Sequence, residues 1–166
     1  AQITRHQNEV KFMSASLQYS GYSNEADFVV PYNLLESQMR FSYLSQCQEA
    51  MRKYKLLVEY GLDNDSAGYL APQGLRNVLI ISATPYQWKH MISQRVCRRN
   101  TDETRYVMLR IWEQLYELAP DLFTCGPFCM FGTCQEGKMC CGSPIRSGLT
   151  PKEIIEADFP LLVEEA

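Results

Sequence analysis

The chain has 166 residues, of which 46% are hydrophobic and 21% charged, a composition that fits a globular domain and excludes disordered and collagen-like classes. Its formal charge of -3 excludes a bulk positive field for duplex nucleic acid or anionic lipid, and no apolar run is long enough to span a membrane. The odd total of seven cysteines and the lack of an apolar leader indicate a reducing compartment, so we expect a cytoplasmic protein. The length predicts one domain over 1–166.

The first half of the chain alternates between polar stretches and one long periodic segment. Residues 1–30 are rich in Ser, Gly, Asn and Tyr, which favours loop or irregular strand. From 32 to 60, apolar residues recur mostly at spacings of three and four, which predicts an amphipathic helix that stops at Gly61. We expect a loop at 63–68 and a short helix or turn at 72–79, which runs into the apolar run LIIS.

Three helices are predicted in the second half from the residues at their N-terminal ends. Thr84 and Pro85 combine a capping hydroxyl with a proline in the first turn. Thr101 is followed by two acidic residues that suit the positive end of a helix dipole, and this helix would run to Pro120. A last short helix is predicted at 150–157. The fold class expected is therefore α+β, helix-rich with a minor strand component.

Five of the seven cysteines lie in a Gly- and Cys-rich loop, residues 124–142. Thiolates can bind zinc tetrahedrally, and the candidate ligands are Cys125, Cys129, Cys134 and Cys141. Because the C-x2-C spacing typical of zinc sites is absent, buried reduced thiols that hold the loop together are the favoured alternative. In the candidate zinc site, Cys140 would be the spare thiol.

A second polar group lies near the N-terminus. It combines a guanidinium, an imidazole, amides and hydroxyls, which could hold a phosphate and a heterocycle. The alternative is an ordinary surface loop. The residues are Arg5, His6, Gln7, Ser14, Ser16 and Gln18.

His90 and Arg95 form a third group on the helix after Thr84. Five residues correspond to about 500° of helix rotation, so the two are neighbours but do not share one stripe. A guanidinium can stabilise a developing oxyanion, whereas the alternative is a solvated basic helix face. The sequence contains no Ser-His-Asp arrangement, P-loop or GxGxxG motif.

Three stretches carry a family resemblance: QITRHQ-(8)-SLQYS (2–20), HMISQRVCRRNTDETR (90–105) and APDLFTCGPFCMFGTCQEGKMCCG (119–142). They resemble the flavin-dependent thymidylate synthases. The first is similar to that family's Q-x-x-R-H-R-(7)-S-x-R-Y-S signature and the second to its H-F-x-x-x-R-x-x-x-R-A-Q-x-E-I-R helix. The third is similar to the GPxC, GxCxEG and CG tail of some members, and LRNVL (75–79) matches A-R-x-x-L-P.

The resemblance assigns roles residue by residue. Arg95 would be the catalytic residue, held against the uracil ring. Ser16 would act as a ligand and not as a nucleophile. The residues that bind the nucleotide would be Gln2, Arg5, Ser16, Gln18 and Arg76. The residues that bind the flavin would be Arg5, His6, Gln7, Ser14 and His90.

The chain also departs from the family pattern. Gln7 stands where the family has Arg, and Ser14 and Gln18 replace an acidic residue and an arginine. Thr84-Pro85-Tyr86 replaces Asn-Ala-Arg, and Thr101 replaces a glutamine. Relative to the family, the chain is expected to lack an N-terminal segment that holds the first strands and a further flavin ligand.

The resemblance implies an enzyme that converts dUMP to dTMP by reductive methylation. FAD would be its cofactor, methylenetetrahydrofolate its carbon donor and NADPH its reductant, in a homotetramer with shared active sites. One alternative is a related uracil-nucleotide hydroxymethylase, which the altered Gln18 and Thr84-Pro85-Tyr86 would allow. The other is a non-catalytic structural or zinc-binding protein that retains the fold.

Overall fold

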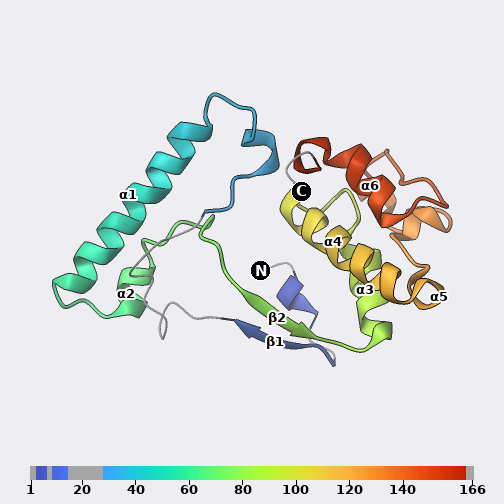
Figure 1. The fold of residues 1–166 in the computed structure, drawn as a ribbon, viewed down its shortest axis with the longest axis horizontal. Helices are drawn as coiled ribbons and strands as arrows, with labels where there is room; N and C mark the ends of the chain where they lie inside the picture. The colour runs from blue at the N-terminus through green and yellow to red at the C-terminus, as the bar shows by residue number, and fades with distance from the viewer. Residues whose placement is uncertain (1–2, 7–8, 15–27, 164–166) are drawn as a thin grey trace. The chain divides into compact units, whose positions relative to one another are not determined.

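The computed structural model describes residues 3–6, 9–14 and 28–163 and is drawn as a ribbon in Figure 1. Within these ranges helices dominate, and the strands β1 (Lys11–Ser14) and β2 (Leu79–Ser82) pair in a two-stranded sheet. The helix-rich α+β class predicted from the sequence is therefore confirmed.

The chain divides into two compact units. One is Phe12–Ile81, and the other combines Ala1–Lys11 with Ser82–Ala166. A single domain over 1–166 stays a prediction. Among the described residues, no helix is both long enough and apolar enough to cross a lipid bilayer.

The unit Phe12–Ile81 is built around two helices, α1 (Arg40–Glu59) and α2 (Asn64–Gly68). Met51 and Tyr54 of α1 pack with Ala67 of α2 in a buried core. Partly buried apolar side chains cover this core: Phe28, Leu57, Val58, Ala71 and Leu75. The periodic apolar residues of the predicted helix thus supply one side of the core.

The predicted stop of α1 at Gly61 is confirmed. Gly61 adopts a left-handed φ of 92°, which is strained for residues with a Cβ. Its N–H donates to Val58 O at 2.9 Å, and the N–H of Leu62 donates to Leu57 O at 3.0 Å. These two bonds form a Schellman motif, so they satisfy carbonyls that the end of the helix would leave unpaired.

The predicted start of this helix, near residue 32, is wrong. The α-helix begins only at Arg40, after a short 3₁₀ helix at Tyr32–Leu34. Ser37 Oγ accepts the N–H of Met39 at 3.2 Å. A serine hydroxyl that takes up a nearby backbone donor favours a turn over a continuous helix, and apolar spacing alone does not reveal this competition.

The loop predicted at 63–68 is also wrong, since α2 occupies most of it. Asp63 caps this helix, because its carboxylate accepts the N–H of Ser66 at 2.8 Å. Asp and Asn favour both loops and helix N-termini, because their side chains bond to nearby backbone N–H groups. The composition of this segment therefore does not distinguish a loop from a capped helix. The segment predicted as a short helix or turn at 72–79 is turn without helix, and it runs into β2.

The second unit contains α3 (Pro85–Arg95), α4 (Asp102–Leu118), α5 (Pro120–Phe123) and α6 (Pro151–Asp158). The predicted starts of α3, α4 and α6 are confirmed. Thr84 and Thr150 cap α3 and α6 through their hydroxyls, and Thr150 forms a capping box with Glu153. The loop at 124–142 is irregular, as predicted, apart from two 3₁₀ turns.

Helix α4 forms the centre of this unit and packs against α3, α5 and α6 (Figure 1). Trp112 of α4 is buried and donates its indole N–H to Phe123 O at 3.0 Å. The buried core includes Met91 and Ile92 from α3 and Ile154 from α6. The same packing fixes where the C-terminal turn of α3 lies relative to α4.

A buried ion pair joins three of these helices. The Arg105 side chain, 6% exposed, donates from Nη2 to Asp158 Oδ2, and from Nε to Val96 O at 3.2 Å. Arg98 donates to the other oxygen of Asp158 at 2.8 Å. The guanidinium of Arg105 also lies 5.2 Å from the ring centroid of Phe159. The end of α3 is therefore tied to both α4 and α6.

We expect Asp158→Asn to destabilise the protein strongly, since it removes the closer carboxylate of the buried Arg105 guanidinium and leaves only that of Asp102, at 3.8 Å. Breaking a buried pair in this way typically costs about 3–5 kcal/mol of unfolding free energy. The control is Arg110→Gln, which removes the more exposed Arg110–Glu113 pair of α4 and should cost less than about 1 kcal/mol. Urea unfolding compares them, and equal losses would contradict the assigned role of Asp158.

Candidate functional site

A cavity of about 560 Å³ lies where the N-terminal segment meets α3, inside one compact unit. The N-terminal segment contributes the short 3₁₀ helix Ile3–Arg5 and the residue that follows it. The residues that line the cavity are Arg5, His6, Tyr86, Gln87, His90, Gln94 and Arg95. Four of them were predicted as site residues: Arg5, His6, His90 and Arg95.

Arg95 is held on two sides. Its Nε donates to His6 Nε2 at 2.9 Å, and its Nη1 donates to Asn100 Oδ1 at 3.3 Å. Asn100 is fixed in turn, because its amide nitrogen donates to Gln94 O at 2.7 Å and to Cys97 O at 3.0 Å. These bonds orient the guanidinium before any ligand binds.

The bond from Arg95 also defines the protonation state of His6. Because Nε2 of His6 accepts, the imidazole is neutral and carries its proton on Nδ1. His6 is 9% exposed, and its pKa is lowered from 6.5 by burial and by the neighbouring charges of Arg95 and His90. The ring of His90 stands nearly perpendicular to that of His6, with 5.7 Å between the centroids.

The cavity is electrostatically positive. Two guanidiniums, from Arg5 and Arg95, line it, and the described lining includes no carboxylate. Burial and the positive charge of Arg5 both lower the pKa of Arg95, because each of them disfavours the charged form of its guanidinium. A site with this charge is suited to an anionic ligand such as a phosphorylated nucleotide.

Helix α3 positions the lining by its regular geometry. Tyr86, His90 and Gln94 follow one another at intervals of four residues and so share one face. Met91 and Ile92 are fully buried and anchor the opposite face in the core. The solvated basic face proposed as the alternative fits the exposed His90 but not Arg95, which is partly buried and bound to His6.

Four residues of this arrangement were not among the predicted site residues, although Tyr86 was noted as a departure from the family pattern. Tyr86, Gln87 and Gln94 line the cavity, and Asn100 holds Arg95 from the turn after α3. The four-residue spacing on either side of His90 was a usable signal for Tyr86 and Gln94. No sequence pattern marks Asn100, because its role depends on how the turn folds back onto the helix.

The lining of this cavity, which lies within one compact unit, does not test the other predicted site residues. Ser14 ends β1, and Arg76 lies before β2 in the other compact unit. The remaining four fall outside the described residues, so their predicted roles stay predictions. They are Gln2, Gln7, Ser16 and Gln18.

The structure does not support the candidate zinc site. Among residues 3–6, 9–14 and 28–163, no three His, Cys, Asp or Glu side chains are grouped so that they could hold a metal ion. Burial raises the pKa of Cys125 to about 11, which disfavours the thiolate that zinc requires. The residues present therefore do not fit zinc. The favoured alternative of buried thiols is also wrong, because Cys125, Cys129 and Cys134 are only partly buried and Cys140 and Cys141 are exposed.

The neutral state of His6 makes its contact with Arg95 sensitive to acid. A folded-state pKa below 6.5 means that the unfolded chain binds a proton more readily, so stability is lost as pH falls below 6.5 through the folded-state value. We expect His6→Gln, whose amide oxygen still accepts from Arg95, to lose less stability over this pH range. Unfolding free energies measured across it, with the His6 imidazole titration by NMR, test this. An equal loss of unfolding free energy with falling pH in both proteins would contradict the role of His6.

Comparison with known proteins identifies the family of this chain. A family model described as thymidylate synthase complementing protein matches residues 1–121. The flavin-dependent thymidylate synthase of Geobacter sulfurreducens is 27% identical over 116 residues, which are 69% of this chain and 50% of the relative. That of Thermococcus kodakarensis is 30% identical over 125 residues, with the same coverage.

The chain spans about half the length of these curated relatives. The family match nevertheless covers most of the chain, and it includes the segments that supply Arg5, His6, His90 and Arg95. The resemblance predicted from the sequence motifs is confirmed. The chain belongs to the family of thymidylate synthase complementing proteins, whose curated relatives are named flavin-dependent thymidylate synthases.

Proposed function

We propose that this chain contributes the nucleotide and flavin site of an enzyme that methylates dUMP to dTMP reductively. The observation that carries the proposal is Arg95, a partly buried guanidinium held by His6 and Asn100 in a cationic cavity. Methylenetetrahydrofolate would supply the carbon and NADPH the reducing equivalents. FAD, when bound, would supply the hydride chemistry that side chains cannot perform.

The cavity residues fit these ligands chemically. Arg5 offers forked donors for a phosphate or pyrophosphate, and the imidazoles of His6 and His90 offer flat surfaces for a heterocycle. Among the described residues, none accepts a hydrogen bond from Nη2 of Arg95. This guanidinium nitrogen can therefore donate to a ligand. The lack of a carboxylate in the described lining avoids repulsion of an anionic substrate.

Arg95 would act on the uracil ring. As negative charge develops on the N3/O2 side of the base, a fixed guanidinium stabilises it without first reorganising. His6 would be a positioning residue, since its neutral Nε2 aligns Arg95 Nε. Gln2, Gln7, Ser14, Ser16, Gln18 and Arg76 retain the ligand roles that the family pattern suggests for them.

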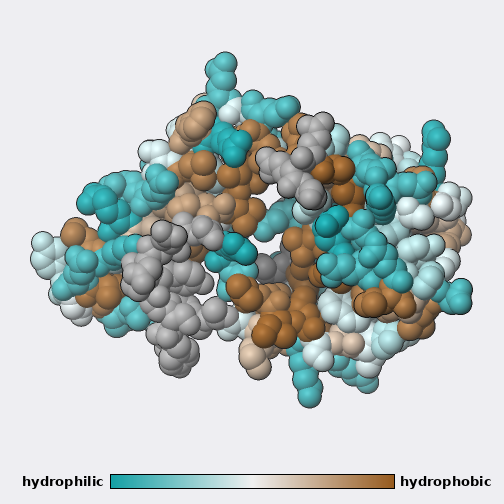
Figure 2. Space-filling view, viewed as in Figure 1, coloured by the Kyte–Doolittle hydropathy of each residue, from teal (hydrophilic) through white to brown (hydrophobic). Residues whose placement is uncertain are grey.

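We further propose a homotetramer, because family sites of this kind are shared between subunits and this chain exposes apolar side chains on α1. Phe41 is 80% exposed and Leu56 41% exposed on α1, and Tyr60, which directly follows the helix, is 81% exposed. Figure 2 shows apolar side chains at the surface along α1. Apolar exposure of this extent on one helix supports a contact with another subunit.

A uracil-nucleotide hydroxymethylase is the second candidate. Tyr86 lines the cavity at the position where the family pattern has an arginine that binds flavin. A phenol in place of a guanidinium alters both the charge and the shape of the pocket near α3. Mass spectrometry of the nucleotide product distinguishes a methyl from a hydroxymethyl group.

We expect the folded full chain to bind FAD and dUMP. Visible flavin absorbance in purified protein, and equilibrium titration with each ligand separately, measure this directly. Arg5→Ala should weaken binding of the phosphorylated ligands, because it removes a cation from the cavity. If folded, oligomeric protein bound neither ligand, the proposed function would be wrong.

We expect Arg95→Ala to lower dUMP turnover by about 100- to 1,000-fold, the typical cost of losing one aimed donor. Arg95→Lys should restore little, since an ammonium cannot bond to His6 and Asn100 and still present a planar donor. Arg110→Ala, on the exposed surface of α4, is the matched control and should retain turnover. Near-normal turnover in folded Arg95→Ala would remove Arg95 from the mechanism.

A further inference from the structure

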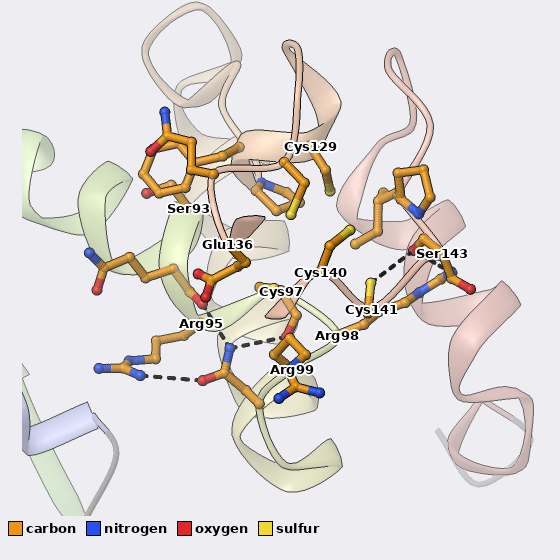
Figure 3. A pocket seen from close by; sticks show the side chains of 18 residues that line it. Ser93, Arg95, Cys97, Arg98, Arg99, Cys129, Glu136, Cys140, Cys141 and Ser143 are labelled. Atoms are coloured by element: carbon orange, nitrogen blue, oxygen red, sulfur yellow. Dashed lines mark hydrogen bonds between the residues drawn. The ribbon is translucent and has the colours of Figure 1, made fainter. Parts of the chain in front are cut away.

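Asn100, in the turn between α3 and α4, reaches Arg95 from outside the cavity that we propose for the nucleotide. The described lining of that cavity does not include Asn100, which instead lines a second cavity, of about 360 Å³, beside the C-terminal end of α3. Figure 3 shows the guanidinium of Arg95 pointing away from the labelled cysteines, with its bond to Asn100 drawn as a dashed line. Asn100 can therefore act on a ligand only through Arg95.

The backbone of the turn determines where Asn100 lies. Val96 donates its N–H to Ile92 O at 3.1 Å and so continues the hydrogen bonding of α3. The N–H of Asn100 then donates to Cys97 O at 3.0 Å, a bond between residues three apart that closes the turn. Helix α4 begins two residues later, at Asp102. The position of Asn100 is therefore set by the ends of both helices.

The side-chain amide of Asn100 has one orientation that satisfies its neighbours. Its nitrogen donates to Gln94 O at 2.7 Å and to Cys97 O at 3.0 Å. Its oxygen accepts from Nη1 of Arg95 at 3.3 Å. The reversed amide would place an oxygen against two carbonyl oxygens, and an NH₂ donor against a guanidinium that has no acceptor. The two carbonyls therefore hold the amide oxygen toward Arg95.

His6 and Asn100 together restrict how Arg95 can meet a ligand. Nε of Arg95 carries one hydrogen, and His6 accepts it, so a ligand cannot bind through Nε. This bond alone leaves the guanidinium free to pivot about it. The second bond, from Nη1 to Asn100, fixes the plane of the guanidinium and with it the direction of Nη2.

The contact depends on a residue in which this chain departs from its family. In the motif H-F-x-x-x-R-x-x-x-R-A-Q-x-E-I-R, which aligns with residues 90–105, alanine stands at the position of Asn100. A methyl group cannot accept a hydrogen bond, so an alanine here would leave Nη1 of Arg95 without this partner.

We propose that Asn100 is a positioning residue that fixes the guanidinium plane of Arg95, so that Nη2 meets the charge that develops on the uracil ring. The inference rests on the proposed function. Asn100→Ala should lower kcat for dUMP by about 10-fold, because a hydrogen bond to a charged group is lost and the donor is no longer aimed. KM should change little, since the cation of Arg5 still attracts the nucleotide.

A double variant of the full chain separates a positioning role from a structural one. When Arg95 is already alanine, adding Asn100→Ala should lower kcat no further, because Asn100 acts through Arg95. Thr150→Ala removes the cap of α6 in the same compact unit, so it controls for lost stability and should retain kcat. A further 10-fold loss in the double variant, or a similar loss in Thr150→Ala, would overturn the proposal.

Crystal structures of the ligand-free full chain distinguish this inference from the proposed function. We expect the Arg95 guanidinium in one position in the wild-type protein and displaced from it in Asn100→Ala, with α3 in place. If the guanidinium keeps its position, or moves only because α3 unwinds, the inference is wrong and the proposed function stands. If the folded, flavin-loaded wild-type chain does not turn over dUMP, the proposed function is wrong, and the positioning role is wrong with it.

Discussion

The unit that holds the candidate site depends on one buried cation. Arg105 of α4 donates to the carboxylate of Asp158 in α6 and to the carbonyl of Val96 at the end of α3. Burying a guanidinium is costly unless it is paired and hydrogen-bonded, so these partners must stay in place together. Because Val96 directly follows Arg95, the same contact fixes the turn that carries the proposed catalytic residue.

The turn between α3 and α4 connects that contact to the cavity. Asn100 caps two carbonyls at the end of α3 and accepts from Arg95, while His6 aligns the same guanidinium from the N-terminal segment. The cavity is consequently built on helix packing and a capped helix end. Such preorganisation lets a guanidinium stabilise charge without first moving into position.

The sequence predicted best the features that depend on neighbours along the chain. Thr84 and Thr150 mark helix starts, and Gly61 marks a helix end, because capping is a local interaction. Local chemistry also led to one wrong prediction, because the capping residue Asp63 was interpreted as part of a loop. The long helix was placed too early because apolar spacing does not register the turn at Ser37.

The site was accessible from the sequence only in part. His6 and Arg95 are 89 residues apart, so no spacing rule links them, and the family resemblance alone placed both in one site. The Cys-rich loop predicted a ligand set but not its geometry, since Cys97 joins the thiols only through the folded chain. Long-range contacts of this kind depend on tertiary packing, which residue pattern does not encode locally.

We propose that the nucleotide binds in the cavity between the N-terminal segment and α3. A crystal structure of the full chain with dUMP and FAD tests this most directly. We expect the uracil ring within hydrogen-bonding distance of Nη2 of Arg95, with His6 still bound to Nε of the same guanidinium. Ligand density elsewhere, with Arg95 bound only to His6 and Asn100, would contradict it.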